Sequence, residues 1–255
     1  MPEADAAPSQ ALLMLESRAI PELFSFALVW PALAAIAPRG DGQPVMVLPG
    51  LANDDSATTP LRGFLAALGY PTYGWDQGAN LGPRPGVEAA MLRRLDKLAE
   101  QHGRTVSLVG WSLGGVYARQ IAKIAPDRVR QVVTLGAPFN GDPRATNGWR
   151  LYELASGLRA EDQDAHIGGP LADPPPAPST AIYSRSDGVC NWRTCLERIG
   201  EMAENIEVRA SHCGLGHDPA AAYAIADRLA QKEGGWTPFD RGGFRAFVYP
   251  EPESA

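Results

Sequence analysis

Apolar runs and helical repeats alternate along the chain between residues 44 and 231. Short runs of β-branched and other apolar residues predict strands at 44–48, 70–75, 105–110, 130–135, 180–184 and 205–209. Apolar residues that recur every three or four positions predict helices at 58–68, 87–101, 113–125 and 219–231. Strands that alternate with helices form a doubly wound, mostly parallel sheet flanked by helices, so we expect an α/β fold.

Residues 139–179 break this alternation. The segment is rich in Pro and Gly, and its one helical pattern lies near 149–158. An insertion of this length above the carboxyl ends of parallel strands usually covers a site, so we predict a lid or cap. Four side chains of this pattern need burial, which favours a packed lid over a disordered linker: Trp149, Leu151, Tyr152 and Leu154.

Residues 19–37 are the most apolar stretch of the chain. Pro21, Glu22 and Pro31 interrupt it, which argues against a membrane-spanning helix. We therefore predict two short amphipathic helices that pack on the core. Contact with lipid, or with the mouth of a substrate site, is the alternative interpretation.

The charges of the chain argue against nucleic acid as a partner and indicate the cellular compartment. The net charge of −6 comes without a concentrated basic surface, so nucleic acid is not an expected partner. The first ten residues contain acidic side chains and neither Lys nor Arg, unlike the basic start of a secretory signal. We expect a cytoplasmic protein.

The length and composition favour one large α/β domain. A chain of 255 residues with 45% hydrophobic residues can build one full core but not two catalytic domains. The predicted organisation is an N-terminal helical segment packed on the core at 1–40, an α/β core at 41–138 and 180–235, the lid insertion at 139–179 and a C-terminal extension at 236–255.

A serine lies on a tight turn between a predicted strand and a predicted helix. The turn reads Gly110-Trp-Ser112-Leu-Gly114-Gly115. A serine hydroxyl is a poor nucleophile, so a protein that uses one must expose it on such an elbow within reach of a base. Gly110 and Gly114 remove the β-carbons that would clash across the turn. Ser112 is therefore the candidate nucleophile.

The candidate base is His212. A serine on a strand–turn–helix elbow is followed along the chain first by its acid and then by its base. His102 and His166 come too early for this order. His212 lies just past the carboxyl end of a predicted strand, where a catalytic base belongs. His217 lies at the start of the last helix, whose positive end disfavours imidazolium, and we interpret it as a capping or surface residue.

The candidate acid is Asp187. It follows the predicted strand 180–184, and Gly188 permits a turn that aims the carboxylate across the strand ends. Four other carboxylates fit less well, three as solvated charges of the lid and one in a predicted helix: Asp162, Asp164, Asp173 and Glu197.

An acyl-transfer site also needs two backbone donors for the oxyanion of its tetrahedral intermediate. The amide of Leu113, directly after the candidate nucleophile, is one candidate. The loop after the first predicted strand supplies the other, and Gly50 lets its backbone approach closely. We predict that this second donor is the amide of Leu51.

The three cysteines, Cys190, Cys195 and Cys213, lack metal-ligand spacing. Cys195 and Cys213 fall in the two loops that hold the candidate acid and base, so a disulfide between them would clamp the site. Buried free thiols are the favoured interpretation, because the expected compartment is reducing.

Several of these segments resemble, in chain order, the motifs of the α/β-hydrolase superfamily in its lipase and esterase branch. They are Pro49-Gly50-Leu51, Gly110-Trp-Ser112-Leu-Gly114-Gly115, Leu135-Gly136-Ala-Pro138, Tyr183-Ser-Arg-Ser-Asp187-Gly188 and Ser211-His212-Cys-Gly214-Leu215. The resemblance covers about residues 41–231. The last motif is similar to the His-x-Gly-Leu segment of small bacterial triacylglycerol lipases. Two departures are Pro-Gly where many relatives have His-Gly, and the longer lid.

The resemblance implies a carboxylesterase or lipase that works through an acyl-enzyme, with Ser112, His212 and Asp187 as its triad. No cofactor or metal is required for this chemistry. The apolar N-terminal segment and the lid aromatics indicate a small hydrophobic ester or lipid as the substrate. Two alternatives stay open: an acyltransferase that uses the same acyl-enzyme, and a non-catalytic protein that binds a hydrophobic ligand.

Overall fold

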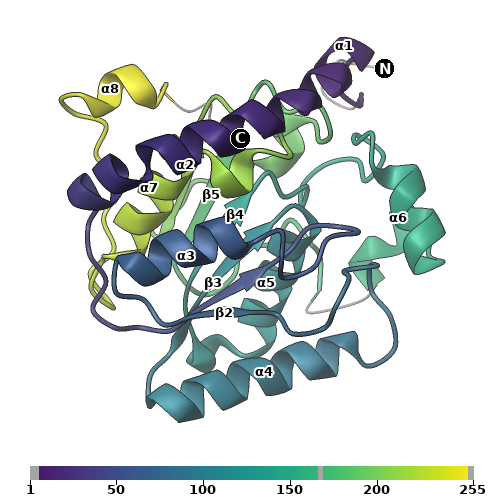
Figure 1. Ribbon diagram of the computed structural model, residues 1–255. Coiled ribbons are helices and arrows are strands. Elements are labelled where there is room, and N and C mark those ends of the chain that lie inside the picture. The colour runs from purple at the N-terminus through teal and green to yellow at the C-terminus, as the bar shows by residue number, and fades with distance from the viewer. Residues whose placement is uncertain (1–5, 166–168, 252–255) are drawn as a thin grey trace.

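A parallel six-stranded sheet lies at the centre of the computed structural model, which describes residues 6–165 and 169–251 (Figure 1). Its strands are β1 (Val45–Leu48), β2 (Thr72–Gly74), β3 (Val106–Trp111), β4 (Val129–Leu135), β5 (Ser179–Tyr183) and β6 (Ala203–Glu207). They lie in the order β2-β1-β3-β4-β5-β6, and each neighbouring pair is parallel.

Helices cover both faces of this sheet. The α-helices of the described residues are α1 (Gln10–Met14), α2 (Ala19–Ile36), α3 (Thr59–Ala67), α4 (Val87–His102), α5 (Leu113–Ile124), α6 (Trp149–Ser156), α7 (Pro219–Leu229) and α8 (Arg245–Val248). Short 3₁₀ turns include η2 (Leu15–Arg18), η3 (Pro126–Arg128), η4 (Ala160–Ala165), η5 (Trp192–Cys195) and η6 (Leu215–His217). Each predicted strand and helix between residues 44 and 231 is present within two residues at either end, so the α/β prediction is confirmed.

The alternation of side chains along each strand divides the core into two layers. In β1, Val45 and Val47 pack with α3 and α7, whereas Met46 and Leu48 face α4 and α5 on the opposite side. Helix α2 lies outside the first layer, across α7 and α3 (Figure 1). The long sheet strands are therefore buried on both faces, as parallel sheets require.

The N-terminal segment departs from the prediction of two short helices. Helix α2 runs without a break through 18 residues, and α1 and η2 lead into it. Pro21 lies in the first turn, where a backbone amide has no partner within the helix, so its missing N–H costs nothing. Pro31 lies inside the helix, which continues past it to Ile36. The prediction that the prolines divide this segment was wrong.

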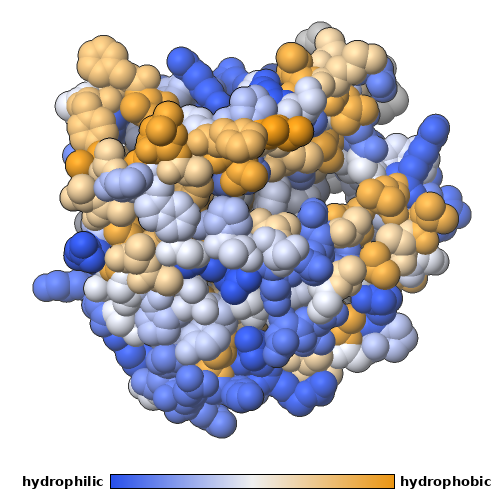
Figure 2. Space-filling model, in the orientation of Figure 1, coloured by the Kyte–Doolittle hydropathy of each residue, from blue (hydrophilic) through white to orange (hydrophobic). Residues whose placement is uncertain are grey.

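Helix α2 buries little of its apolar surface. Phe26 and Leu33 face the core, and Phe26 and Trp30 make ring contacts with Phe64 of α3. Large apolar side chains on the outer face of α2 remain exposed to solvent, and Figure 2 shows them as an orange band along the helix. By length and hydropathy alone, the helix Gln10–Ile36 could cross a membrane, but core helices and signal sequences pass the same test. The cytoplasmic location stays a prediction.

The described segment after α7 packs on the same side of the sheet as α2. In the segment after α7, Phe239 and Tyr249 are buried with their ring centroids 4.7 Å apart, and both belong to the core layer of α7. The segment 139–179 instead carries α6 and η4 beyond the carboxyl ends of the strands (Figure 1). This position fits the predicted lid or cap, whose function stays a prediction. Leu151 and Leu154 of α6 are exposed, so the prediction that they are buried was wrong.

Candidate active site

The turn between β3 and α5 is an elbow that projects Ser112 beyond the sheet. Ser112 has φ 53° and ψ −124°, a backbone conformation that a non-glycine residue seldom adopts. A Cβ on Gly110 would overlap the backbone of Gly114, and a Cβ on Gly114 would overlap that of Leu48. Only glycine fits at these two positions, which explains the pattern around Ser112.

Strand register brings the remaining candidate residues to the same edge of the sheet. Leu48 pairs with Gly110, Trp111 with Leu135, and Tyr183 with Glu207, so the strands end at nearly one level. The loops that follow them carry the predicted nucleophile, acid, base and amide donors. Because the strands are parallel, residues distant in sequence meet at this edge.

His212 and Asp187 form a buried hydrogen-bonded pair at this edge. Nδ1 of His212 lies 2.6 Å from Oδ2 of Asp187. The other carboxylate oxygen of Asp187 accepts hydrogen bonds from the amides of Val189 (2.8 Å) and Cys190 (2.7 Å). A carboxylate held in this way keeps the proton on Nδ1 of His212, which leaves Nε2 free to accept one.

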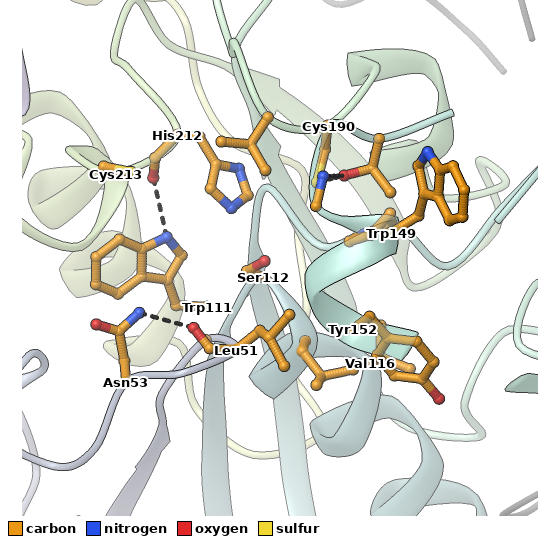
Figure 3. A pocket seen from close by; sticks show the side chains of 16 residues that line it. Leu51, Asn53, Trp111, Ser112, Val116, Trp149, Tyr152, Cys190, His212 and Cys213 are labelled. Atoms are coloured by element: carbon orange, nitrogen blue, oxygen red, sulfur yellow. Dashed lines mark hydrogen bonds between the residues drawn. The ribbon is translucent and has the colours of Figure 1, made fainter. Parts of the chain in front are cut away.

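The electrostatics of the pair favour a protonated imidazole. Burial alone would lower the pKa of His212, but the negative charge of Asp187 outweighs burial and raises this pKa well above its ordinary value. The base loop is also fixed by Trp111, whose indole N–H donates to the carbonyl of His212 at 3.0 Å. Figure 3 places the imidazole beside the hydroxyl of Ser112.

Gly136, at the end of β4, makes room for this pair. It has φ +53°, and a Cβ there would lie 3.1 Å from both Oδ2 of Asp187 and Nδ1 of His212. The sequence analysis used Gly136 only as part of a motif. The signal for its role, a glycine directly after a strand that precedes the acid and base, is too common to be specific.

Two amides are available for an oxyanion. Neither the N–H of Leu51 nor that of Leu113 donates a hydrogen bond to any of the residues that the structure describes. Gly50 allows the two loops to approach, since a Cβ there would lie 3.2 Å from Cβ of Ser112. The pair matches the predicted donors, and their role in binding an oxyanion stays a prediction.

The buried side chain of Asn80 holds the loop that carries Leu51. Its amide nitrogen donates to the carbonyl of Pro49 at 2.8 Å. Its backbone carbonyl accepts from Ala52 at 2.7 Å, and its backbone N–H donates to the carbonyl of Asn53 at 2.8 Å. Asn80 thereby fixes both ends of a short loop. The sequence analysis missed it, because an isolated Asn in a Gly-rich loop carries no distinctive pattern.

A cavity of about 340 Å³ opens above Ser112. Figure 3 shows His212 on one side of the serine, Leu51 and Val116 near its base, and Trp149 and Tyr152 on the opposite wall. The lining is mainly apolar and aromatic. Both aromatic residues come from α6, so the predicted lid segment supplies part of the cavity wall.

The other residues considered for the site lie elsewhere or outside the description. His217 is buried, and its Nε2 lies 3.0 Å from the carbonyl oxygen of Ala19, so the prediction of a surface position was wrong. Glu197 forms a buried ion pair with Arg119 and lies in an extended loop, not in the predicted helix. His102 contacts the hydroxyl of Tyr73 at 2.8 Å.

The lid carboxylates do not reach the candidate site within the described residues. Asp162 and Asp173 are exposed, as predicted for solvated charges. His166 lies outside the described residues, as does the side chain of Asp164. Asp187 is therefore the predicted acid that the structure brings to His212.

The cysteines are free thiols, so the suggested disulfide between Cys195 and Cys213 is not formed. Cys190 and Cys195 are buried, whereas Cys213 is exposed at the cavity mouth, so the predicted burial was wrong for Cys213. Cys190 lies beside the acid–base pair, and the donor atoms of Asp187, Cys190 and His212 lie within 4.8 Å of one another. The neighbouring Cys195 thiol and burial raise the pKa of Cys190 well above its usual range.

The comparisons with known proteins identify the fold. No protein-family model matches the sequence, and the search of curated proteins found no match. Among solved structures, a pyrethroid hydrolase from Sphingobium faniae is 18% identical with a TM-score of 0.53, over 73% of this chain and 97% of that one. A monoacylglycerol lipase from Paleococcus ferrophilus is 16% identical with a TM-score of 0.52, over 75% and 96%.

A third similar structure is an α/β hydrolase enzyme from the metagenome of lagoon sediments at Mar Chica, Morocco. It is 18% identical with a TM-score of 0.51, and the match covers 74% of this chain and 90% of that one. Likeness at this level of identity establishes architecture, not activity. The chain has the α/β-hydrolase fold that the motifs predicted.

Proposed function

We propose that this protein is a serine hydrolase that cleaves carboxylic esters with a hydrophobic acyl group, an esterase or lipase. The observation that carries the proposal is the hydrogen bond between His212 and Asp187 beside Ser112 on its elbow. Three side chains in the order serine, acid, base meet at the carboxyl ends of parallel strands. A buried acid–base pair next to a serine hydroxyl that lines a cavity supports nucleophilic catalysis.

In the first half of the reaction, Oγ of Ser112 attacks the ester carbonyl carbon while Nε2 of His212 accepts the hydroxyl proton. The carbonyl oxygen gains negative charge, which the amides of Leu51 and Leu113 bind. Asp187 stabilises the imidazolium that forms. His212 then gives its proton to the alkoxide oxygen as the carbon–oxygen bond breaks, so the alcohol leaves and an ester with Ser112 remains.

In the second half, water takes the place of the alcohol. Nε2 of His212 accepts a proton from the water as its oxygen bonds to the acyl carbon. The same two amides bind the oxyanion. The bond to Oγ of Ser112 then breaks, the serine oxygen regains the proton from His212, and the carboxylic acid leaves.

The cavity lining supports a hydrophobic acyl group. Val116, Trp149 and Tyr152 face the space next to Ser112, and few polar side chains line it (Figure 3). Apolar walls bind alkyl or aromatic groups by removing them from water, at about 0.8 kcal/mol for each buried methylene. A volume of about 340 Å³ accommodates a small or medium acyl chain. We further propose that the segment 139–179 acts as a lid over this cavity.

The decisive experiment compares wild type with Ser112→Ala on a series of p-nitrophenyl esters of increasing acyl length, and adds labelling by a fluorophosphonate probe. Wild type should hydrolyse the esters and take up the probe, and Ser112→Ala should lose about 10³-fold or more of the activity. The exposed Ser56 provides a matched control, since Ser56→Ala should behave like wild type.

The same assay separates the alternatives. A folded wild-type protein that neither turns over esters nor reacts with the probe would be a binding protein, and our proposal would be wrong. Preferential transfer of the acyl group to an added alcohol or amine, instead of to water, would identify an acyltransferase. Activity that survives in Ser112→Ala would exclude the assigned nucleophile.

A further inference from the structure

Two acidic side chains of the N-terminal segment reach the loops that carry the candidate acid and base. Glu16 lies in η2 and Glu22 in the first turn of α2. These residues are nearly two hundred positions from the loop of His212, and the sequence analysis did not consider either of them for the site. Their contacts indicate that the N-terminal segment is part of the active-site framework.

The carboxylate of Glu16 joins both loops. One oxygen accepts from the amide of Gly188 at 2.7 Å, next to Asp187, and from the amide of His212 at 3.0 Å. The other oxygen accepts from the amide of Cys213 at 2.8 Å. One side chain therefore accepts from the backbone amide of the residue after the acid and from the backbone amide of the base.

Glu22 strengthens the same junction from the next turn. It accepts hydrogen bonds from the amide of Ser211, at 3.0 Å, and from the Ser211 hydroxyl. Arg18 pairs with Glu22 at 3.1 Å and donates to the carbonyl of Ser186 at 2.8 Å. The N-terminal segment thus contacts the acid loop on both sides of Asp187.

The backbone contact is equally close. A Cβ on Gly188 would overlap the carbonyl of Leu12. The φ of Gly188 is not positive, so this close approach, and not the backbone conformation, requires glycine there. The sequence analysis assigned Gly188 to a turn. Its role in the structure is to let the N-terminal segment approach the acid loop.

The charge on Glu16 is maintained at neutral pH. Burial alone would raise the pKa of Glu16, but the amide donors of Cys213, His212 and Gly188, together with the charge of His212, lower it below its usual value. Hydrogen bonds to an ionised acceptor are shorter and stronger than neutral ones. Without Glu16, the partly buried amides of Gly188 and His212 and the exposed amide of Cys213 would lose their acceptor, and the loss is costly for the two partly buried ones.

We propose that Glu16 is a positioning residue that fixes the acid loop and the base loop relative to each other, so that the N-terminal segment determines the geometry of the His212–Asp187 pair. This inference rests on the proposed function. Glu16 does not line the cavity, so it acts on the chemical step through His212 and not on substrate binding. Small misplacements of catalytic groups lower rates strongly.

The test uses Glu16→Ala and Glu16→Gln in the full chain, with kcat and KM measured on one p-nitrophenyl ester well below the unfolding temperature. We expect kcat to fall about 10- to 100-fold in Glu16→Ala, with KM close to wild type. Glu16→Gln should lose less, because its carbonyl oxygen still accepts from Gly188 and His212 while its amide nitrogen opposes the N–H of Cys213.

A second readout reports the geometry directly. The proton on Nδ1 of His212 should give a downfield NMR signal in wild type, and this signal should shift or broaden in the folded Glu16 variants. Ser17→Ala is the matched control, because Ser17 is exposed in the same 3₁₀ turn and its hydroxyl contacts only the carbonyl of Met14 among the described residues. It should leave kcat and the NMR signal unchanged.

The outcomes separate this inference from the proposed function. If wild type hydrolyses the ester and a folded Glu16 variant keeps both wild-type kcat and the wild-type NMR signal, the positioning role is wrong and the proposed function stands. If wild type itself is inert to ester and to fluorophosphonate, the proposed function fails first. Should Glu16→Ala not fold, Glu16→Gln carries the comparison alone.

Discussion

Nδ1 of His212 lies 2.6 Å from Oδ2 of Asp187, although 25 positions separate the two residues along the chain. The contact arises because β5 and β6 are parallel neighbours whose ends lie side by side. Each loop then needs only a few residues to bring its side chain to the other. Both side chains are buried, so the bond between them is screened little by water.

Asp187→Asn should nearly abolish activity while the protein remains folded. The Asn oxygen can still accept from the amides of Val189 and Cys190, but its NH₂ group would face Nδ1 of His212 and favour the wrong tautomer. We expect kcat to fall by about 10³- to 10⁴-fold. Steady-state kinetics with a circular dichroism control checks this, and a loss below tenfold would show that Asp187 does not orient the base.

The pH dependence of wild type should show an acidic limb at a pH above the ordinary histidine pKa. Asp187 raises the pKa of His212, and the protonated imidazole cannot accept a proton, so kcat/KM should rise with pH through that raised value. In Asp187→Asn the limb should move to lower pH. A limb that stays in place would mean that another group controls it.

The raised pKa of His212 also makes the stability of the fold depend on pH. Because the folded protein binds the His212 proton more tightly than the unfolded chain does, this interaction stabilises the fold fully below about pH 6.5 and is lost as pH rises through the raised pKa. The free energy of unfolding of wild type relative to Asp187→Asn should therefore decrease with rising pH over that window. Urea titrations at several pH values measure it.

Gly136→Ala should separate the acid from the base. The added methyl group would lie 3.1 Å from both Asp187 and His212, and φ +53° adds backbone strain of about 1 kcal/mol. We expect kcat/KM to fall by about 10- to 100-fold. Gly103→Ala is the control, since Gly103 has φ +59° and nothing within 4 Å of a Cβ. It should lose similar stability from strain and keep its activity.

Asn80→Ala should weaken catalysis through the loop of Leu51. It removes the hydrogen bond from the Asn80 side chain to the carbonyl of Pro49, so the amide of Leu51 would no longer be held in place. We expect kcat to fall by up to about 10²-fold, with little change in KM, because an oxyanion donor acts mainly in the transition state. An increase in KM with kcat unchanged would contradict this role.

Asp218→Asn should stabilise the protein at neutral pH. Asp218 caps α7 by accepting from the amide of Ala221 at 2.8 Å, and burial raises its pKa to about 6. Asn preserves the cap without a buried charge. The wild-type fold loses stability as pH rises through about 6, so the variant should gain up to about 3 kcal/mol relative to wild type between pH 4 and pH 7. Urea unfolding at the two pH values tests it, and an equal difference at both would exclude this cause.

Local patterns were enough to predict the sheet and to select the candidate residues that the structure brings together. A nucleophile elbow is a short-range motif, and parallel strands bring their carboxyl ends together, so Ser112, Asp187 and His212 follow from strand positions and chain order. Gly136 and Glu16 could not be predicted in this way, because their roles depend on which loops pack against them. Pro31 misled the prediction, since α2 continues through it to Ile36.

The contacts of Glu16 determine when the candidate active site can form during synthesis. The first helices leave the ribosome 196 positions before His212, an interval on the order of 10 to 40 s of translation. During that time the apolar surface of α2 has neither α7 nor the loop of residues 211–213 to cover it. The face of α2 that later packs on α7 therefore stays uncovered for this interval, and the nascent chain is open to aggregation there until synthesis ends.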